Sequence, residues 1–249
     1  MRRWQPALRA AAELLMPRAC VACSGAMESA DRGLACGRCW SRLPLLPKPW
    51  CARCGHPLHP GARGCTVCTE IHPHCELARS VCWLPHAASS PLVAALKYQG
   101  WWGIADGMAE RMVRTGRELL AGLAEPCFVA VPLAAGRVRE RGFNQSERLA
   151  RALAERTGGR VLDDVLVRER DTVSQTQLTP AERVVNVHGA FAVPEGRPAA
   201  ISGRAIILVD DVLTTGATLN ACADALLNGG ATHIRYWTFG RARAVADRP

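Results

Sequence analysis

Four Cys-x-x-Cys pairs constrain the fold of this 249-residue chain more than any other feature of its sequence. They follow one another after gaps of twelve, eleven and ten residues, and they are Cys20/Cys23, Cys36/Cys39, Cys51/Cys54 and Cys65/Cys68. Two thiolates on one such turn can bind the same ion, and two turns complete a tetrahedral zinc site. The eight cysteines therefore predict two structural zinc ions.

The pairing of the four turns stays open. Sequential pairing places the first two turns on one ion and the last two on the second, and we favour it slightly over a cross-braced pairing of alternate turns. An iron–sulfur cluster would need the same cysteines, and a disulfide scaffold would need an oxidising compartment. Five nearby residues could replace a ligand, although we expect the histidines among them on the surface: His56, His59, His72, His74 and Cys75.

Composition divides the chain into three parts. Residues 1–16 carry apolar side chains at helical spacing and predict a short amphipathic helix. Residues 17–75 are rich in Gly, Pro and Cys and lack a periodic apolar pattern, so we expect bound metal to hold them together as a double zinc ribbon. Residues 76–249 form the third part, in which apolar and polar residues alternate in the patterns of an ordinary folded domain.

Residues 76–249 predict an α/β domain, because strand and helix patterns alternate as they do in a parallel sheet flanked by helices. We expect strands at 80–84, 127–131, 161–167, 205–209 and 233–239, and helices at 91–98, 104–123, 145–156 and 218–227. Asn144 is the expected N-cap of the third helix. Residues 168–191 show no clear period, and we expect them to form a long functional loop.

Composition and charge narrow the class of protein. With 49% hydrophobic and 21% charged residues, the chain can bury a core and is not disordered throughout. No run approaches the roughly 18 apolar residues of a membrane span, and Arg9 and Glu13 interrupt the one signal-like segment. We therefore expect a cytoplasmic protein without a membrane span. The net charge of +9 suits a polyanionic partner or, equally, a solvated surface.

The strongest chemical signal follows the most apolar predicted strand. Asp210 and Asp211 end that strand and precede a threonine-rich turn into a helix. Free N–H groups at a helix start suit a phosphate, and carboxylates at the carboxyl end of a strand suit the hydroxyl groups of a sugar. Helix capping is the alternative role, but two adjacent buried carboxylates are costly without partners. The predicted phosphate-binding residues are Thr214, Thr215, Gly216, Ala217 and Thr218.

This segment resembles the phosphoribosyl diphosphate motif of type I phosphoribosyltransferases. An earlier strand ends in a turn of small residues that resembles the diphosphate-binding loop of the same enzymes, formed here by Ala134, Ala135, Gly136 and Arg137. Arg141 follows closely, and we expect it to contact a phosphate. Lys97, one of only two lysines, is a further expected diphosphate ligand. A solvated surface position is the alternative for both residues.

Four further motifs together resemble the ComF family of competence-associated, phosphoribosyltransferase-like proteins. They are Leu-Lys-Tyr-Gln-Gly at 96–100, Arg-Gly-Phe-Asn-Gln at 141–145, Ser-Gln-Thr-Gln-Leu at 174–178 and Arg-Val-Val-Asn-Val-His-Gly-Ala-Phe at 183–191. That family also begins with a Cys-rich zinc ribbon, so the resemblance spans nearly the whole chain. It implies a type I phosphoribosyltransferase-like fold, binding of 5-phosphoribosyl 1-diphosphate with Mg²⁺, and catalytic roles for Asp210, Asp211, Arg141 and Lys97.

Three functions are consistent with this resemblance. The first is a phosphoribosyltransferase that serves DNA uptake in natural transformation and uses an acceptor the sequence does not identify. The second is a protein without turnover that binds single-stranded DNA across the zinc ribbon and is regulated by phosphoribosyl diphosphate. The third retains the phosphoribosyl site as a relic and uses the ribbon to dock other competence proteins.

Overall fold

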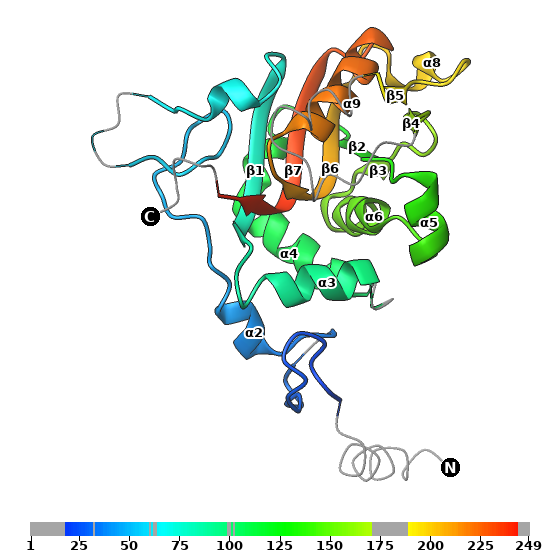
Figure 1. The fold of residues 1–249 in the computed structure, drawn as a ribbon. Coiled ribbons are helices and arrows are strands. Elements are labelled where there is room, and N and C mark those ends of the chain that lie inside the picture. Colours follow the sequence, from blue (N-terminus) through cyan, green and yellow to red (C-terminus); the bar gives the residue numbers. More distant parts are fainter. Residues whose placement is uncertain are drawn as a thin grey trace.

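The computed structural model describes residues 18–31, 33–59, 61, 64–98, 101, 103–170 and 189–243. Within these residues, five parallel strands form one sheet in the order β1-β7-β6-β2-β3 (Figure 1). The strands are β1 (Cys75–Leu84), β2 (Cys127–Ala130), β3 (Arg160–Val161), β6 (Ala205–Leu213) and β7 (His233–Ala242). The expected α/β architecture is confirmed. The helix predicted at 1–16, the motif at 174–178 and most of the loop expected at 168–191, including most of the motif at 183–191, lie outside the described residues.

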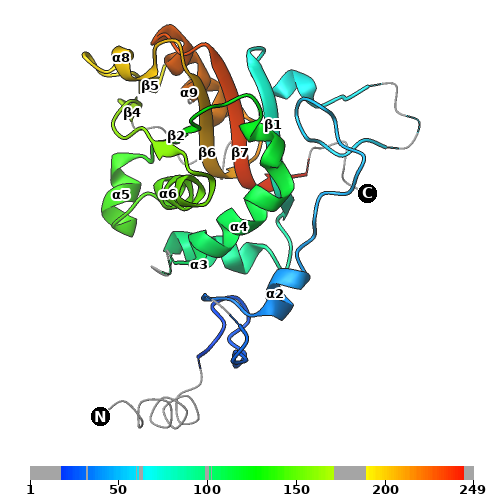
Figure 2. The ribbon, with the colours of Figure 1, turned by 180° about the vertical axis from the view of Figure 1, so that it is seen from behind.

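Helices cover both faces of this sheet. Figures 1 and 2, which view the molecule from opposite sides, show α9 (Ala217–Asn228) on one face and α4 (Ile104–Gly116) on the other. The second face also carries α6 (Gln145–Thr157), which packs against α4. Successive side chains of a strand point to opposite faces, so β6 contributes Ile207 to the core under α4 and α6 and Ile206 to the core under α9. Burial on both faces explains the unbroken apolar run of this strand.

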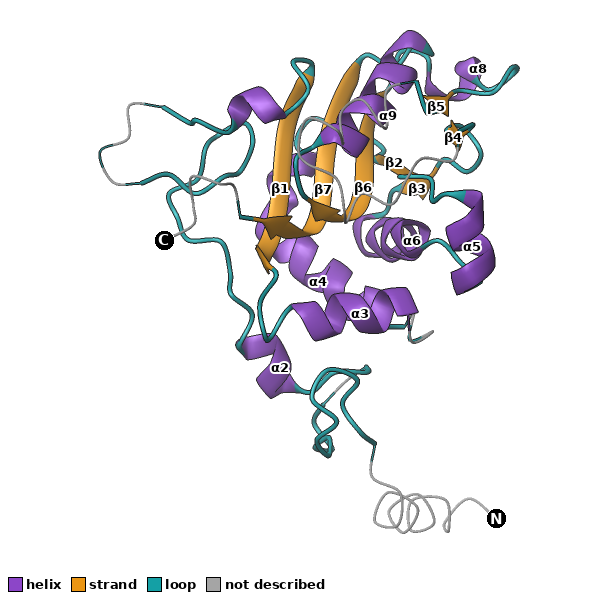
Figure 3. Cartoon of the chain, in the orientation of Figure 1, coloured by secondary structure: helices purple, strands orange, loops and turns teal. Residues whose placement is uncertain are grey.

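The remaining helices are shorter or lie at the ends of strands. They are α2 (Gly37–Ser41), α3 (Ser90–Tyr98), α5 (Ala135–Arg141) and α8 (Pro198–Ile201). Short 3-10 helices occur at Cys68–Glu70 and Arg117–Leu120. Between α2 and β1 the chain is mostly loop (Figure 3), as expected of a segment closed by metal rather than by an apolar core.

Several predicted elements are confirmed with small changes of length. The helices expected at 91–98, 145–156 and 218–227 correspond to α3, α6 and α9. Asn144 is the N-cap of α6, because its Oδ1 accepts a hydrogen bond from the backbone N–H of Ser146 at 3.0 Å. Gly158 ends this helix in the left-handed conformation that glycine adopts without strain. The strands predicted at 80–84, 205–209 and 233–239 are each longer than expected.

Two predicted elements are wrong in extent. The strand expected at 161–167 is divided, because Asp163 and Asp164 form a turn in which Asp164 has a φ of +57°. Its second half, β4 (Val167–Arg168), pairs with β5 (Phe191–Ala192) in a separate antiparallel pair. The helix expected at 104–123 ends at Gly116, a residue type that is poorly suited to a helix interior, and it continues only as a 3-10 turn.

The segment between the second and third cysteine pairs runs along the outer edge of β1. Leu46 donates its backbone N–H to the carbonyl of Val81 at 3.2 Å, and Trp83 donates to the carbonyl of Pro44 at 2.9 Å. An isolated antiparallel bridge joins Leu45 to Cys82 between these two bonds. The loop thereby satisfies polar groups that the edge strand would otherwise present to other chains.

The cysteine-rich segment contributes to both cores of the sheet. Cys20 and Cys36 belong to the core under α4 and α6, whereas Cys51 and Cys54 belong to the core under α9. The two halves of the segment are thus integrated into the domain rather than joined to it by a bare linker. Among the described helices, none is both long and apolar enough to cross a membrane.

Candidate functional site

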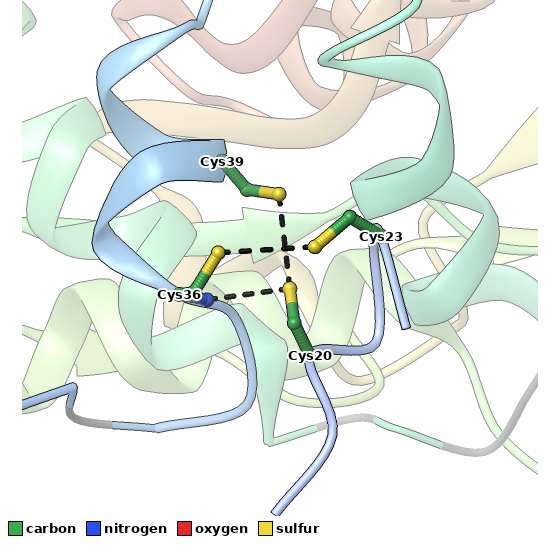
Figure 4. A group of neighbouring side chains, drawn as sticks. All are labelled: Cys20, Cys23, Cys36 and Cys39. Atoms are coloured by element: carbon green, nitrogen blue, oxygen red, sulfur yellow. Dashed lines mark hydrogen bonds between the residues drawn. The ribbon is translucent and has the colours of Figure 1, made fainter. Parts of the chain in front are cut away.

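The eight paired cysteines form two clusters, and the four turns combine sequentially. The first cluster contains Cys20, Cys23, Cys36 and Cys39 (Figure 4), and the second contains Cys51, Cys54, Cys65 and Cys68. The four Sγ atoms of each cluster lie within 4.8 Å of one another. The structure therefore favours the sequential pairing over the cross-braced one.

The spacing of the sulfur atoms fits one tetrahedral ion per cluster. Four Zn–S bonds of about 2.3 Å in a tetrahedron place the sulfur atoms about 3.8 Å apart. In the first cluster the Sγ atoms of Cys20 and Cys39 are 3.7 Å apart, and those of Cys23 and Cys36 are 3.9 Å apart. The corresponding distances in the second cluster are 3.3 and 3.4 Å, which are shorter than the tetrahedral spacing. A four-thiolate donor set of this size is suited to structural zinc.

The nearby histidines do not join either cluster. His59 and His74 are exposed, as expected, but the expectation was wrong for two others: His56 is 5% exposed and His72 is 9% exposed. The His56 ring packs edge-on against Trp83, with 5.8 Å between the ring centroids. The Nε2 atom of His72 lies 3.0 Å from Oδ1 of Asp224 on α9. These two histidines are buried because the cysteine-rich segment packs directly on the sheet and on α9.

The second candidate site lies at the carboxyl end of β6. Asp210 and Asp211 are the sixth and seventh residues of this strand, so their side chains start from opposite faces of the sheet. Asp211 is buried at 4% exposure, and Asp210 is partly exposed. Each carboxylate has a defined partner from another element, as the cost of burying charge requires.

Asp211 is paired with a lysine from a distant part of the chain. The Nζ atom of Lys97, in the last turn of α3, forms an ion pair with Oδ2 of Asp211. Burial alone would lower the pKa of Lys97, but the charges of Asp211 and Asp210 outweigh it, and the pKa is raised above its ordinary value. Lys97 is therefore charged at neutral pH and lies within the carboxylate site, not on the open surface.

Asp210 is held by the start of α6. Its Oδ1 accepts hydrogen bonds from the hydroxyl of Ser146 and from the backbone N–H of Asp211, both at 2.8 Å. Burial and the neighbouring charge of Asp211 raise the pKa of Asp210 to about 7, although the hydrogen bond from Ser146 acts in the opposite direction. Ser146 was not among the predicted site residues, and its place one residue after the Arg-Gly-Phe-Asn-Gln motif was the available signal.

The residues of that motif connect β2, α5 and α6. Asn144 donates from Nδ2 to the carbonyl of Val131 at 3.0 Å, which ties the start of α6 to the end of β2. Arg141 donates from Nη1 to Oε1 of Gln145 at 3.0 Å and lies with its guanidinium carbon 4.7 Å from the ring centroid of Tyr98. Within the described residues, the buried Nε of Arg141 has no hydrogen-bond partner.

The turn predicted to bind diphosphate is the start of a helix. Ala134 is the N-cap of α5, and its carbonyl accepts from the backbone N–H groups of Arg137 and Val138 at 2.8 and 3.0 Å. Ala135 and Gly136 form the first turn of this helix. Small side chains at these positions leave the backbone at the end of β2 accessible, although the conformation is helical rather than an open turn.

The threonine-rich turn connects β6 to α9. Gly216 is the N-cap of α9 and has a φ of +78°, which an L side chain rarely adopts. A Cβ atom there would also lie 2.7 Å from the carbonyl oxygen of Glu70, so only glycine fits. Thr214 is exposed, and Thr215 and Thr218 are partly exposed. The turn therefore presents hydroxyl groups and the first N–H groups of α9 next to Asp210 and Asp211.

Comparison with known proteins finds matches to both parts of the chain. A family of double zinc ribbon domains matches residues 11–75, and a family of phosphoribosyl transferase domains matches residues 138–248. The chain is 28% identical to "Competence protein F" of Haemophilus influenzae over 228 residues, which cover 90% of this chain and 96% of that protein. It is 30% identical to "DNA utilization protein YhgH" of Escherichia coli K12 over 235 residues, which cover 92% of this chain and 99% of that protein.

Two further matches cover less of the chain. "Competence protein ComFC" of Streptococcus pneumoniae is 32% identical over 114 residues, which are 46% of this chain and 47% of that protein. A crystal structure of a hypoxanthine phosphoribosyltransferase from Staphylococcus aureus is 12% identical and covers 59% of this chain and 69% of its own, with a TM-score of 0.32. That similarity is too low to assign residue roles. The two matching families and the relative that is 30% identical over 99% of its own length show that the chain belongs to the ComF family, which joins a double zinc ribbon to a phosphoribosyltransferase domain.

Proposed function

We propose that this chain binds 5-phosphoribosyl 1-diphosphate together with Mg²⁺ at the carboxyl end of β6. One observation carries the proposal. A single connection from β6 to α9 contains two adjacent carboxylates, Asp210 and Asp211, and then Gly216 in the left-handed conformation at the start of the helix. Backbone N–H groups at the start of a helix favour a phosphate, and adjacent carboxylates can accept hydrogen bonds from two sugar hydroxyl groups. No comparable connection in the described residues combines these two features.

In this proposal each group of residues has a separate role. The turn formed by Thr214, Thr215, Gly216, Ala217 and Thr218 holds the 5′-phosphate, and Asp210 and Asp211 hold the ribose. Lys97 and Arg141 face the diphosphate, with Arg141 able to donate from its unpaired Nε. Ala134, Ala135, Gly136 and Arg137 line the same region at the start of α5. Mg²⁺ is bound mainly by oxygen atoms of the ligand and by water.

If the chain is an enzyme, its reaction is displacement of diphosphate from the anomeric carbon by an acceptor. The transition state resembles an oxocarbenium ion, so the protein needs no nucleophile of its own. Its residues fix the ribose, hold the phosphate and stabilise the negative charge of the departing diphosphate. In this proposal Lys97 and Arg141 supply the two positive charges for that last role.

A second candidate function follows from the names of the relatives. Two of them are called competence proteins and one a DNA utilization protein. We propose a cytoplasmic role in DNA uptake during natural transformation, either as a transferase or as a protein that binds single-stranded DNA or other competence proteins through the zinc ribbon. The first 80 residues carry 11 of the 31 basic side chains and only 5 of the 22 acidic ones, which suits a polyanion.

Calorimetric titration with phosphoribosyl diphosphate and Mg²⁺ tests the ligand site. We expect the wild type to bind and the variant with Asp210→Asn and Asp211→Asn to lose binding. The matched control is Asp163→Asn with Asp164→Asn, a second pair of adjacent aspartates that are 49% and 79% exposed in a surface turn. Unchanged binding in the first double variant would falsify the assignment. Diphosphate release across a panel of acceptors then separates a transferase from a protein that only binds.

A further inference from the structure

The second cysteine cluster contacts the proposed phosphate-binding turn through a short stretch of backbone. The 3-10 helix Cys68–Glu70 starts at a cluster cysteine and ends at Glu70. The carbonyl oxygen of Glu70 lies so close to Gly216 that a Cβ atom there would be 2.7 Å away. The same carbonyl accepts a hydrogen bond from Nδ2 of Asn220 at 2.9 Å. The segment after Cys68 therefore abuts the first turn of α9.

Asn220 uses its whole amide group to make this connection. Its Oδ1 accepts from the backbone N–H of His72 at 2.9 Å and from the hydroxyl of Tyr236 at 3.1 Å. Its backbone N–H donates to the carbonyl of Gly216 at 2.8 Å, the first bond of the helix. Through its side chain and its backbone N–H, Asn220 thus joins the cysteine-rich segment, strand β7 and the turn that begins α9. A second link on the same helix, between His72 and Asp224, holds the segment in place.

The contacting segment is in turn organised by the other half of the second cluster. Arg53 lies inside the turn of Cys51 and Cys54, and its guanidinium donates to the carbonyls of His72 at 2.6 Å and Pro73 at 3.1 Å. It also donates to the carbonyl of Cys75 at 3.0 Å. An ion held by the four cysteines would join this turn to Cys68 and so fix the position of Glu70. The first cluster makes no such contact with α9 among the described residues, since its Cys20 and Cys36 belong to the core on the opposite face.

We propose that Asn220 is a positioning residue through which the second cysteine cluster sets the conformation of residues 214–218. Metal in this cluster raises the affinity for a phosphorylated ribose, and metal in the first cluster does not. The affinity part of this inference rests on the proposed function, whereas the mechanical link between the cluster and the turn does not. The reason for the coupling is that the carbonyl of Glu70 lies against Gly216 and accepts a hydrogen bond from Asn220, so a displacement of Glu70 would disturb both residues.

The first experiment measures binding of phosphoribosyl diphosphate with Mg²⁺ to the full chain carrying Asn220→Ala. We expect roughly tenfold weaker binding, the effect of losing well-formed hydrogen bonds at a partly buried contact. Asn228→Ala is the matched control, because Asn228 is an exposed asparagine at the far end of the same helix. Both variants keep all eight cluster cysteines. Wild-type affinity in a folded Asn220→Ala protein would overturn the proposal.

The second experiment measures amide hydrogen exchange of residues 214–218 without ligand. We expect faster exchange in Asn220→Ala and in a Cys65→Ser/Cys68→Ser variant, and wild-type exchange in Asn228→Ala and Cys36→Ser/Cys39→Ser. Faster exchange throughout the chain would indicate general destabilisation and would also count against a positioning role. If the wild type fails to bind phosphoribosyl diphosphate, the proposed function fails, while the exchange pattern still decides whether the cluster and the turn are linked.

Discussion

Lys97 on α3 and Asp211 on β6 form an ion pair in which the two side chains are 22% and 6% exposed. The pair joins the Leu-Lys-Tyr-Gln-Gly motif to the carboxylates of the strand, although the two residues are far apart in sequence. It neutralises a buried carboxylate when no ligand is bound. In the proposed complex, Lys97 would divide its charge between Asp211 and the diphosphate, so it contributes to both stability and binding.

Replacing Lys97 with methionine should destabilise the fold. The substitution keeps much of the apolar stem but leaves Asp211 buried without a counter-charge, and breaking a buried ion pair in this way costs about 3 kcal/mol. Urea denaturation should show this loss in the free energy of unfolding. The double variant Lys97→Met/Asp211→Asn should be more stable than Lys97→Met alone, because the uncompensated charge is removed.

The other lysine of the chain provides the control. Lys48 is exposed, and its Nζ lies 4.9 Å from the ring centroid of Trp50. Lys48→Met should change the free energy of unfolding by less than about 1 kcal/mol, the usual scale for an exposed cation near an aromatic ring. Equal effects of the two lysine substitutions would contradict a special role for the Lys97 ion pair.

The raised pKa of Asp210 predicts that stability falls as the pH rises toward 7. Burial and the charge of Asp211 raise this pKa from 3.8 to about 7, so the folded chain binds more protons than the unfolded chain between these values. The contribution of Asp210 to the free energy of unfolding is complete when the pH is below 3.8. It is lost as the pH rises through about 7, at a rate of up to about 1.4 kcal/mol per pH unit.

Denaturation over a pH series from about 5 to 8 checks this prediction. Asp210→Asn should remove this part of the pH dependence, because the amide does not titrate while its Oδ1 can still accept from Ser146. Parallel pH profiles for the wild type and the variant would show that Asp210 is already ionised throughout the range. In that case Asp210 would have an ordinary pKa in spite of the neighbouring charge of Asp211.

The local pattern around Asp210 and Asp211 was sufficient to predict their strand, the helix after it and the turn between them. Those features depend on apolar periodicity and on short-range signals such as Gly216, which operate over a few residues. The bond from Ser146 to Asp210 and the ion pair from Lys97 to Asp211 were not predicted, because they depend on the order of strands in the sheet. Sequence spacing alone carries no information on such contacts between distant elements.

The cysteine-rich segment shows the same limit. Its two four-cysteine clusters could be predicted from turn spacing, because each ligand pair lies within one tight turn. The burial of His56 and His72 could not, since it results from packing of the whole segment on the sheet and on α9. Helix α5 was also missed, because its polar sequence lacks an apolar face and the helix buries no residue of its own.

Zinc analysis of two double variants tests the sequential pairing directly. Cys20→Ser/Cys36→Ser removes two ligands from one cluster, so the purified protein should retain one zinc ion per chain. Cys20→Ser/Cys51→Ser removes one ligand from each cluster, and we expect both zinc ions to be weakened or lost. Cross-braced sites would reverse the two results, and iron in place of zinc would contradict the assignment of the metal.

Gly107 on α4 determines how closely the first cysteine cluster can pack on the domain. Trp40 follows Cys39 in the chain, and the guanidinium carbon of Arg111 lies 3.8 Å from the centroid of its ring. The same ring contacts Phe239 edge-on, with 6.5 Å between the ring centroids. A Cβ atom on Gly107 would lie 2.7 Å from this indole, which is closer than real atoms approach. In an isolated helix, alanine is more favourable than glycine. In Gly107→Ala the gain in helix propensity and the cost of the clash with Trp40 therefore change the free energy of unfolding in opposite directions.

We expect the packing term to decide the effect of Gly107→Ala. Overpacking of this kind costs about 1–3 kcal/mol, which exceeds the roughly 1 kcal/mol that alanine gains over glycine in a helix. The free energy of unfolding should therefore fall, and tryptophan fluorescence should report a more solvated Trp40. Gly64→Ala is the control, because a Cβ atom there meets nothing within 4 Å and its backbone is not left-handed. A more stable Gly107→Ala protein would show that Trp40 can move away from α4 at little cost, and that the first cluster is held to the domain mainly by its other contacts.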